Sequence, residues 1–554
     1  MKARKLLLWG AVLLVALALR LVALGAAPLS PDEALTALPS LDASRGDGWP
    51  TASESPLLLT GNALLFLLLG PSDVTARLLP ALAGTALVAL PWLWRRRLGE
   101  LGALTATGLL ALSPIALFGA RHLDAAVIGT LGAALVLTAL STVQRRPDLL
   151  LAAGLALGLT GGPAFYDALL PGLAAWALAR HSFGHEPYPA QEDVLRGLLI
   201  GGGGALLISV GFGLRWSEFA GPAQGLATWI RAWWTPSANG STNLAHLLLY
   251  EPVTLLLVAI GLSLPSRLSR GSVQLAAWIG LGGGLILLRP GTAPLSLLAL
   301  LAPLALLAGR TVARLAFIPP WQTYVHAALT WVFWGFAGLA IIQQPGSLTA
   351  PLVLLVVVIQ GLLTAGFVTL IGRAQAWRGL LMGTVLALLL IQGGFAWRAN
   401  FVQATAPHEP LVTSLASQDL VNLQETTEML RLTRHVSPET FEIVLVEADA
   451  GTTAALRWTL RTWPALHVTP IWPQTTPDLV VAPQDAIPPL GAAKIFQGMA
   501  FTVARQPHTR VPSCQQLLPP VCPGPLEWYV YRTSPVPVQR VRTILWTPQP
   551  PDQP

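Results

Sequence analysis

Apolar runs long enough to cross a bilayer recur along the first 396 residues, and this feature limits the possible folds more than any other. A helix of about 20 apolar residues spans the hydrocarbon core. Hydrophobic residues make up 53% of the chain and charged residues 11%, whereas soluble domains carry about 25% charged residues. The sequence therefore predicts a polytopic α-helical membrane protein. The runs expected to span the membrane are 6–25, 76–94, 101–118, 124–142, 148–162, 164–180, 197–214, 251–265, 272–288, 292–309, 323–343, 350–371 and 379–396.

Short loops that carry arginine alternate with loops that lack it. The positive-inside rule places the basic loops in the cytoplasm, which explains the formal net charge of +7 without a nucleic-acid partner. The same alternation predicts about thirteen spans, a cytoplasmic N-terminus and an extracytoplasmic C-terminus in a cell membrane. The run 6–25 is longer than a signal-peptide core, so it is expected to remain as the first span. We expect 148–180 to form two spans, because a single span would reverse the side of every later arginine loop.

The chain is expected to divide into a transmembrane domain, 1–396, and an extracytoplasmic tail domain, 397–554. A first outside loop, 26–75, and a middle outside loop, 215–250, belong to the transmembrane domain. The first loop contains "PLLLTGNALLFLLLG", which is too short to span and is typical of a segment lying at the membrane surface.

The tail domain differs in composition, because charged residues and proline become more frequent. The stretches "FEIVLVEA", "PDLVVAP" and "EWYVYR" are typical of strands, and helices are expected over 414–435 and 452–461. This pattern predicts a small α/β domain whose end, "TPQPPDQP", is disordered. Cys514 and Cys522 are either joined by a disulfide, which an extracytoplasmic location would allow, or free thiols.

Two adjacent carboxylates, Asp32 and Glu33, follow the first predicted span directly in "LSPDEA". The next outside loop, "SPIALFGARHLDAAV", leaves the bilayer on the same side and carries Arg121, His122 and Asp124. Charged residues at a membrane face usually have a task, because a carboxylate costs several kcal/mol in hydrocarbon. We therefore expect Asp32 and Asp124 to meet at one site on the membrane surface.

Such residues suit several roles at once. An aspartate at a low-dielectric surface can take a proton from a hydroxyl, and an arginine can bind a phosphate. Asp32, Asp124 and His122 have the chemistry to hold a divalent cation such as Mg²⁺ or Mn²⁺. A second interpretation is a capping box, in which Ser30 caps the helix and Glu33 is its reciprocal partner. The two interpretations are compatible.

Several short motifs resemble the GT-C superfamily of membrane glycosyltransferases. The resemblance is to the branch of protein O-mannosyltransferases and aminoarabinose transferases, and most to the flippase-activity-associated family. The motifs are "LSPDEA" after the first span, "SESPLLLTGNALLFLLLG", "PSDVTARLLPALAGTALV", "LSPIALFGARHLDAAV", "NLAHLLLYEPVTLLLVAIGL" and the tail stretch "ALRWTLRTWP". The resemblance implies a GT-C-like fold and transfer of a sugar from a polyprenyl-phosphate donor to an unidentified acceptor hydroxyl.

The resemblance also implies roles for individual residues. Glu54 falls where relatives have an acidic residue followed by a basic one and proline, but here the next residue is Ser55. Arg289 has a second interpretation as an interfacial arginine, and Glu251 as a helix N-terminal charge. The implied roles are a catalytic base at Asp32 with Asp124 and Glu33 beside it, donor-phosphate binding by Arg121, His122 and Arg289, and acceptor or substrate contacts from Glu54, Tyr250 and Glu251.

Two features are better explained by packing than by chemistry. The run "IGGGGALL" lies in a predicted span and lacks the lysine of a phosphate-binding loop, so it is expected to allow close helix packing. Trp229 and its neighbours in "LATWIRAWWTP" are typical of an interfacial belt.

The sequence leaves two alternative functions open. One is binding or flipping of lipid-linked sugars without transfer, and the other is a role as a subunit of an envelope-glycan complex.

Overall fold

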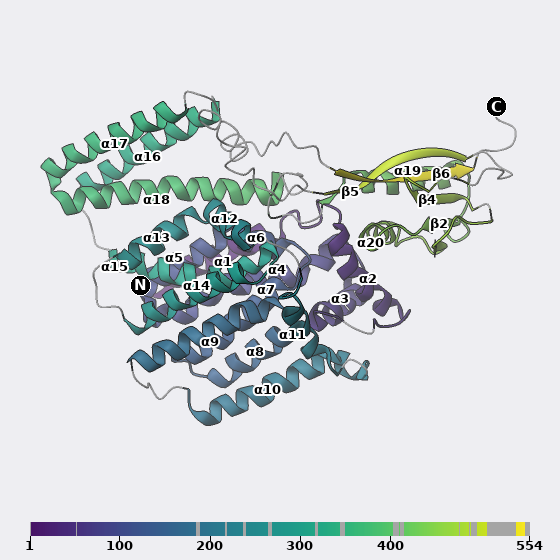
Figure 1. Cartoon of the computed structure of the whole chain (residues 1–554), viewed down its shortest axis with the longest axis horizontal. Helices are drawn as coiled ribbons and strands as arrows, with labels where there is room; N and C mark the ends of the chain where they lie inside the picture. Colours follow the sequence, from purple (N-terminus) through teal and green to yellow (C-terminus); the bar gives the residue numbers. More distant parts are fainter. Residues whose placement is uncertain are drawn as a thin grey trace.

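The computed structural model has a large helical part and a smaller domain built on a β-sheet (Figure 1). The helices α16, α17 and α18 lie along one side of the helical part, and α2 and α3 lie between it and the sheet domain. The residues that the structure describes are 2–50, 53–183, 189–216, 219–235, 240–263, 269–315, 320–343, 349–402, 409, 411, 415–475, 477–486, 488, 496–506 and 539–548.

Every run expected to span the membrane is helical over most of its described residues. The stretch 148–180 forms two separate helices, as predicted. The helices of this part are α1 (Lys2–Leu21), α2 (Pro31–Arg45), α3 (Pro56–Leu69), α4 (Asp73–Ala89), η1 (Leu90–Trp94), α5 (Arg95–Leu112), α6 (Pro114–Arg121), α7 (Ala126–Ser141), α8 (Pro147–Thr160), α9 (Ala164–Phe183), α10 (Gln191–Ser209), η2 (Gly211–Gly213), α11 (Gly221–Arg231), α12 (Gly240–Tyr250), α13 (Pro252–Ser263), α14 (Arg270–Leu288), η4 (Pro294–Leu297), α15 (Leu298–Leu315), α16 (Trp321–Gln343), α17 (Thr349–Ile371), α18 (Arg373–Trp397) and η5 (Arg398–Val402).

Fewer helices than predicted are long and apolar enough to cross a membrane by themselves. Within the described part of the chain five helical stretches meet that condition, or up to seven if each of two bent helix pairs is one span. The reason is length, since α8 has 14 residues and α13 has 12. At 1.5 Å per residue they reach only about 20 Å, less than the hydrocarbon thickness of about 30 Å. The count of thirteen spans and their sidedness stay predictions.

Serine N-caps begin several helices of the membrane part. The Ser30 hydroxyl accepts a hydrogen bond from the Glu33 N–H at the start of α2, and the Glu33 carboxylate accepts one from the Ser30 N–H. The capping box expected from "SPDE" is therefore confirmed. Ser55 and Ser113 cap α3 and α6 in the same way, each followed by a proline at the first helical position. Proline fits there because that residue has no helical partner for an N–H.

Close helix contacts in this part depend on glycine. A Cβ on Gly132 of α7 would lie 2.5 Å from the Gly158 nitrogen of α8. In the run "IGGGGALL", Gly201 of α10 faces Ala152 of α8, where a Cβ would lie 2.9 Å from the carbonyl oxygen. That finding confirms the packing role predicted for the run, although Gly202 and Gly203 of α10 have open space around them.

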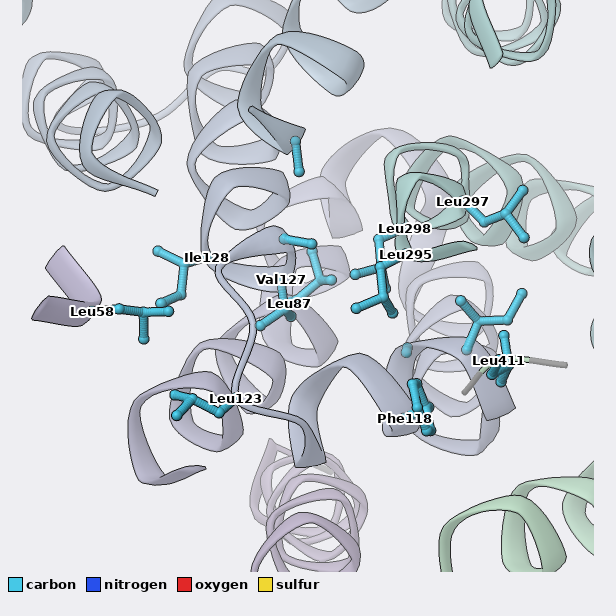
Figure 2. Close-up of a cluster of buried hydrophobic side chains, with 14 of the residues drawn as sticks. Leu58, Leu87, Phe118, Leu123, Val127, Ile128, Leu295, Leu297, Leu298 and Leu411 are labelled. Atoms are coloured by element: carbon cyan, nitrogen blue, oxygen red, sulfur yellow. The ribbon is translucent and has the colours of Figure 1, made fainter. Parts of the chain in front are cut away.

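One apolar core joins the ends of several helices next to the segment 26–75, which we call the first outer loop. Figure 2 shows part of it, and the labelled residues come from α3, α4, α6, α7, η4 and α15 and from two connecting segments, at Leu123 and Leu411. Burial of these side chains holds α2 and α3 over the ends of α6 and α7, where the charged residues of the two outer loops meet. The labelled members include Leu58, Leu87, Phe118, Leu123, Val127, Ile128, Leu295 and Leu298.

The tail domain is an α/β domain, as the sequence predicted. Its six strands lie in the order β1-β5-β6-β4-β2-β3, with β2 parallel to both β3 and β4 and the other pairs antiparallel. The stretch "EWYVYR", Cys514 and Cys522 lie outside the described residues. The elements are β1 (Leu415–Ala416), α19 (Asp419–Thr433), β2 (Ile443–Val446), α20 (Ala450–Thr459), β3 (Leu466–Thr469), β4 (Leu479–Pro483), β5 (Phe496–Gln506) and β6 (Gln539–Pro548).

Helix α20 of the tail domain packs along α2 of the first outer loop (Figure 1). A Cβ on Gly451, at the start of α20, would lie 3.1 Å from Cβ of Pro31, at the start of α2. Near the other ends of the same helices, Arg457 lies 3.4 Å from the Asp42 carboxylate. The two helices therefore run in the same direction, side by side.

Candidate active site

Glu33 is the most tightly held charged residue of the first outer loop. Its carboxylate accepts hydrogen bonds from Arg77 of α4 at 2.6 and 2.7 Å and from the backbone N–H groups of Ser30 and Leu123 at 2.9 and 2.8 Å. The Nδ1 atom of His122 lies 3.2 Å from the same carboxylate. Glu33 is 1% exposed, so these contacts replace the water it has lost.

Burial by itself would raise the pKa of Glu33. The charges of Arg77 and His122, with hydrogen bonds from Arg77 and the Ser30 N–H, outweigh burial and lower the pKa from 4.5 to about 2. The carboxylate is thus ionised and fully engaged. It joins α2 to α4 and to the connection between α6 and α7.

Asp32 lies one residue earlier, on the exposed side of α2. Asp124 lies in the connection between α6 and α7, where its carboxylate accepts a hydrogen bond from the Ala126 N–H at 2.6 Å. Asp124 is close enough to Asp32, Glu33 and His122 to interact with their charges. The structure therefore brings together the two outer loops from which the sequence predicted a site.

A cavity of about 190 Å³ lies on the Arg77 side of Glu33. Arg121 and His122 line it, with Asn400 and Phe401 from the segment that follows α18. The Arg121 guanidinium donates to backbone carbonyls at the end of α1, including Val22 at 2.7 Å and Ala23 at 3.0 Å. Its donors are largely used in capping α1.

A second cavity, of about 410 Å³, lies on the other side of α2. Arg289, which follows α14, forms an ion pair of 2.7 Å with Asp167 of α9. The indole N–H of Trp229 donates to the same carboxylate at 2.8 Å, and the guanidinium carbon lies 5.7 Å from the Trp229 ring centre. The Nε atom of Arg289 is buried and has no hydrogen-bond partner among the residues that the structure describes. One donor of this cation therefore has no acceptor among the described residues.

Carboxylates line the same cavity as that cation. Asp124 and Glu54 both contribute to its wall, and the Thr228 hydroxyl donates to Glu54 at 3.3 Å. Ser55, which follows Glu54, donates its hydroxyl to the Thr160 carbonyl at 3.0 Å and caps α3. The predicted residues that line a cavity thus divide between two, with Glu33, Arg121 and His122 in the smaller one and Arg289, Glu54 and Asp124 in the larger. Asp32 lines neither of them.

Tyr250 and Glu251 lie at the 93° bend between α12 and α13. Both are buried and line neither cavity. The Tyr250 hydroxyl donates to Glu409. Glu251 accepts from the side chains of Ser113, Thr254 and Gln392. The structure places this pair in a polar cluster that joins α6, α13 and α18.

The described residues contain no group of three or more His, Cys, Asp or Glu side chains close enough to hold a metal ion. Glu33 also has little capacity left for a cation, because Arg77 and two backbone N–H groups already bind both of its oxygens. Of the predicted metal ligands, Asp32 and Asp124 are the two carboxylates that lie near each other.

Arg77 and Asp167 are site residues to which the sequence analysis gave no role. Each is a charged residue inside an apolar run, at 76–94 and 164–180. Charged residues in such runs usually pair with another charge or line a functional cavity, and this rule would have identified both. Their partners, Glu33 and Arg289, lie in other elements, so only the tertiary structure reveals the pairs.

The described residues form apolar helices whose connections carry the clustered charges, and the fold is similar to the GT-C fold of solved glycosyltransferases. A similar solved structure is ArnT from Cupriavidus metallidurans bound to undecaprenyl phosphate. The two sequences are 16% identical, the match covers 86% of this chain and 93% of that chain, and the TM-score is 0.51. Its apo structure gives the same values. This likeness confirms the fold that the sequence motifs implied.

A weaker likeness is to the Archaeoglobus fulgidus oligosaccharyltransferase in its apo form. The identity is 11%, the TM-score is 0.45, and the match covers 84% of this chain and 64% of that chain. No family model and no curated protein matches the sequence.

Proposed function

We propose that this protein transfers a sugar from a polyprenyl-phosphate donor to an acceptor hydroxyl outside the cytoplasm. The observation that carries the proposal is the 410 Å³ cavity, which is lined by the buried Arg289, by Glu54 and Asp124, and by residues of the helix that carries Asp32. The fold supports it, because ArnT shares that fold and was crystallised with undecaprenyl phosphate. The donor's prenyl tail would stay in the bilayer while its head group enters the cavity.

Arg289 is the proposed phosphate ligand. Its Nε–H is buried and has no hydrogen-bond partner among the described residues, so a phosphate oxygen would satisfy it. Asp167 and Trp229 hold the rest of the side chain in place. Arg121 and His122 then serve as positioning residues, because Arg121 caps α1 and His122 lies against Glu33.

Asp32 is the proposed general base. It takes the proton from the acceptor hydroxyl as the hydroxyl oxygen forms its bond to the anomeric carbon of the sugar. The bond from that carbon to the phosphate oxygen breaks, and its electron pair leaves with the polyprenyl phosphate. Asp124, whose charge interacts with that of Asp32, would assist, and Glu33 would position both loops. If the reaction uses a divalent cation, Asp32 and Asp124 are the carboxylates that would hold it, and it would stabilise the charge of the phosphate.

The test uses purified protein in lipid, radiolabelled polyprenyl-phosphate hexoses and a membrane extract as the acceptor pool. We expect Asp32→Asn to reduce label transfer by about 10²-fold or more while donor binding is kept, because a positioned base contributes about that factor. The matched control is Asp485→Asn, an exposed aspartate of the tail domain that lines neither cavity. Loss of transfer with a chelator would add a metal to the mechanism.

The main alternative is binding or flipping of a lipid-linked sugar without transfer. It predicts that wild-type protein binds the donor but transfers no label with any acceptor fraction. Equal transfer by Asp32→Asn and wild type would remove Asp32 from the chemistry.

A further inference from the structure

A third cavity, of about 450 Å³, lies between the C-terminal half of α2 and the segment of the tail domain from α20 to β3. We call it the α2–α20 cleft. It shares no lining residue with the two cavities of the candidate active site. Its charged and indole-bearing residues are Asp42, Arg45, Asp47, Arg457, Arg461 and Trp463.

The cleft holds three guanidinium groups and two carboxylates. Arg457 pairs with Asp42 at 3.4 Å. Arg45 donates to the Arg461 carbonyl at 2.6 Å, and Arg461 donates to the carbonyls of Pro71 and Trp458 at 3.3 and 2.7 Å. The hydrogen bonds of Arg45 and Arg461 are thus made to neutral oxygens, and the cleft carries surplus positive charge.

The charges of these two arginines also act on each other. Burial lowers the pKa of Arg461, the charge of Asp73 opposes this effect, and the nearby charge of Arg45 lowers the pKa further. Two cations held near each other are stabilised when an anion binds between them. The guanidinium group prefers oxyanions, because its planar donors match two oxygens of a phosphate or carboxylate.

Trp463 gives a second, independent observation. Its side chain is 7% exposed and packs on Phe441, with ring centres 5.4 Å apart. Its indole N–H is buried and has no hydrogen-bond partner within the described part of the chain. A buried donor without an acceptor costs about 1–3 kcal/mol, a cost that an oxygen of a bound ligand would remove.

We infer that the α2–α20 cleft binds an oxyanion, a phosphate or a carboxylate, carried by the acceptor. That the bound molecule is the acceptor rests on the proposed function, whereas binding of an oxyanion in the cleft does not. Arg45, Arg461 and the Trp463 N–H supply the donors. The ligand is a phosphorylated or uronic-acid-bearing saccharide.

The cleft also connects with the candidate active site along α2. A cavity of about 420 Å³ shares Leu38, Asp42 and Arg457 with the cleft, and shares Leu35 and Pro39 with the 410 Å³ cavity. Helix α2 has 15 residues and is therefore about 22 Å long. A saccharide chain held at the cleft can thus extend along α2 toward Asp32.

The test measures binding to the full-length protein in detergent without donor. The anionic probe is a hyaluronan tetrasaccharide, which carries carboxylates, and the neutral probe is the tetrasaccharide chitotetraose. Inorganic phosphate serves as the competitor. We expect the anionic tetrasaccharide to bind about tenfold more tightly than the neutral one, and Arg45→Gln and Trp463→Phe each to weaken it about tenfold. Arg431→Gln, which alters an arginine of α19 paired with Glu428, is the matched control and should bind like wild type.

Both variants are expected to fold, because Arg45 is exposed and Trp463→Phe keeps an aromatic ring at that position. Their melting temperatures check this expectation. Competition by phosphate supports a phosphorylated acceptor, and binding unaffected by phosphate supports a uronic acid. Equal binding of the two tetrasaccharides, or unchanged binding in both cleft variants, overturns the inference. If cleft binding follows the expected pattern while no donor gives transfer, the proposed function fails and the oxyanion site remains.

Discussion

At the scale of single residues, two adjacent carboxylates have opposite environments. Asp32 is exposed, whereas Glu33 is buried and accepts hydrogen bonds from Arg77, Ser30 and Leu123. The same turn of helix α2 can therefore supply one carboxylate for chemistry and one for structure. The helical period separates them, since successive residues point about 100° apart.

Glu33→Gln should lower the stability of the protein by about 3 kcal/mol at pH 7, because it leaves the Arg77 charge buried without its partner. The pKa of Glu33 is lowered from 4.5 to about 2, so its stabilising effect is complete above pH 4.5 and is lost as the pH falls through 2. The measurement is thermal unfolding of wild type and Glu33→Gln from pH 7 to pH 2.

The difference between the two proteins should be full at pH 7 and shrink below pH 4.5. Asp32→Asn is the matched control and should unfold like wild type, because Asp32 is exposed. A constant difference down to pH 2 would contradict the ion-pair explanation.

At the scale of elements, glycine sets how closely the helices of the membrane part approach. Helices α7 and α8 meet at Gly132, Gly154 and Gly158. Small residues allow backbones to approach and gain van der Waals contact where lipid offers no hydrophobic driving force.

Gly132→Ala should destabilise the protein by about 1–3 kcal/mol, because the added methyl would lie 2.5 Å from the Gly158 nitrogen and must push the backbones apart. The check is the melting temperature in detergent. Gly108→Ala, at a helical glycine of α5 with open space around it, is the control and should be neutral or slightly stabilising. Equal effects of the two substitutions would rule out close packing as the cause.

At the scale of the whole molecule, the tail domain is held against the loop that carries Asp32. Besides the contact of α20 with α2, the indole N–H of Trp458 donates to Asp73 at 2.7 Å, and Arg461 donates to the Pro71 carbonyl. The tail domain therefore packs on the first outer loop from α2 to the start of α4. An acceptor bound by the tail domain would be held at a fixed place relative to Asp32.

The pair Pro31→Cys with Gly451→Cys should form a disulfide, because a Cβ on Gly451 lies 3.1 Å from Cβ of Pro31, near the range that a disulfide needs. Cys514 and Cys522 would first be replaced by serine. Thiol alkylation and intact mass should find no free thiol after mild oxidation.

Each single variant is the control and should keep one free thiol. Two free thiols in the oxidised double variant would contradict the packing of α20 on α2.

The sequence predicted much of the fold because its signals are local. Apolar runs specify helices by their own composition, and the capping box follows from four residues, "SPDE". The span count was less predictable, because helices such as α8 are buried among neighbours and need not reach across the bilayer alone. The approach of the two loops that carry Asp32 and Asp124 was also predicted, and the structure joins these loops through the contacts of Glu33 with His122 and Leu123.

The partners of the charged residues could not be predicted in this way. Glu33 pairs with Arg77 across 44 residues and Asp167 with Arg289 across 122 residues. The sequence by itself determined that these charges lie next to or within apolar segments, where an isolated charge is too costly to remain alone. Only the tertiary structure decided which partner each one has, because the packing of distant helices sets which side chains come within hydrogen-bond distance.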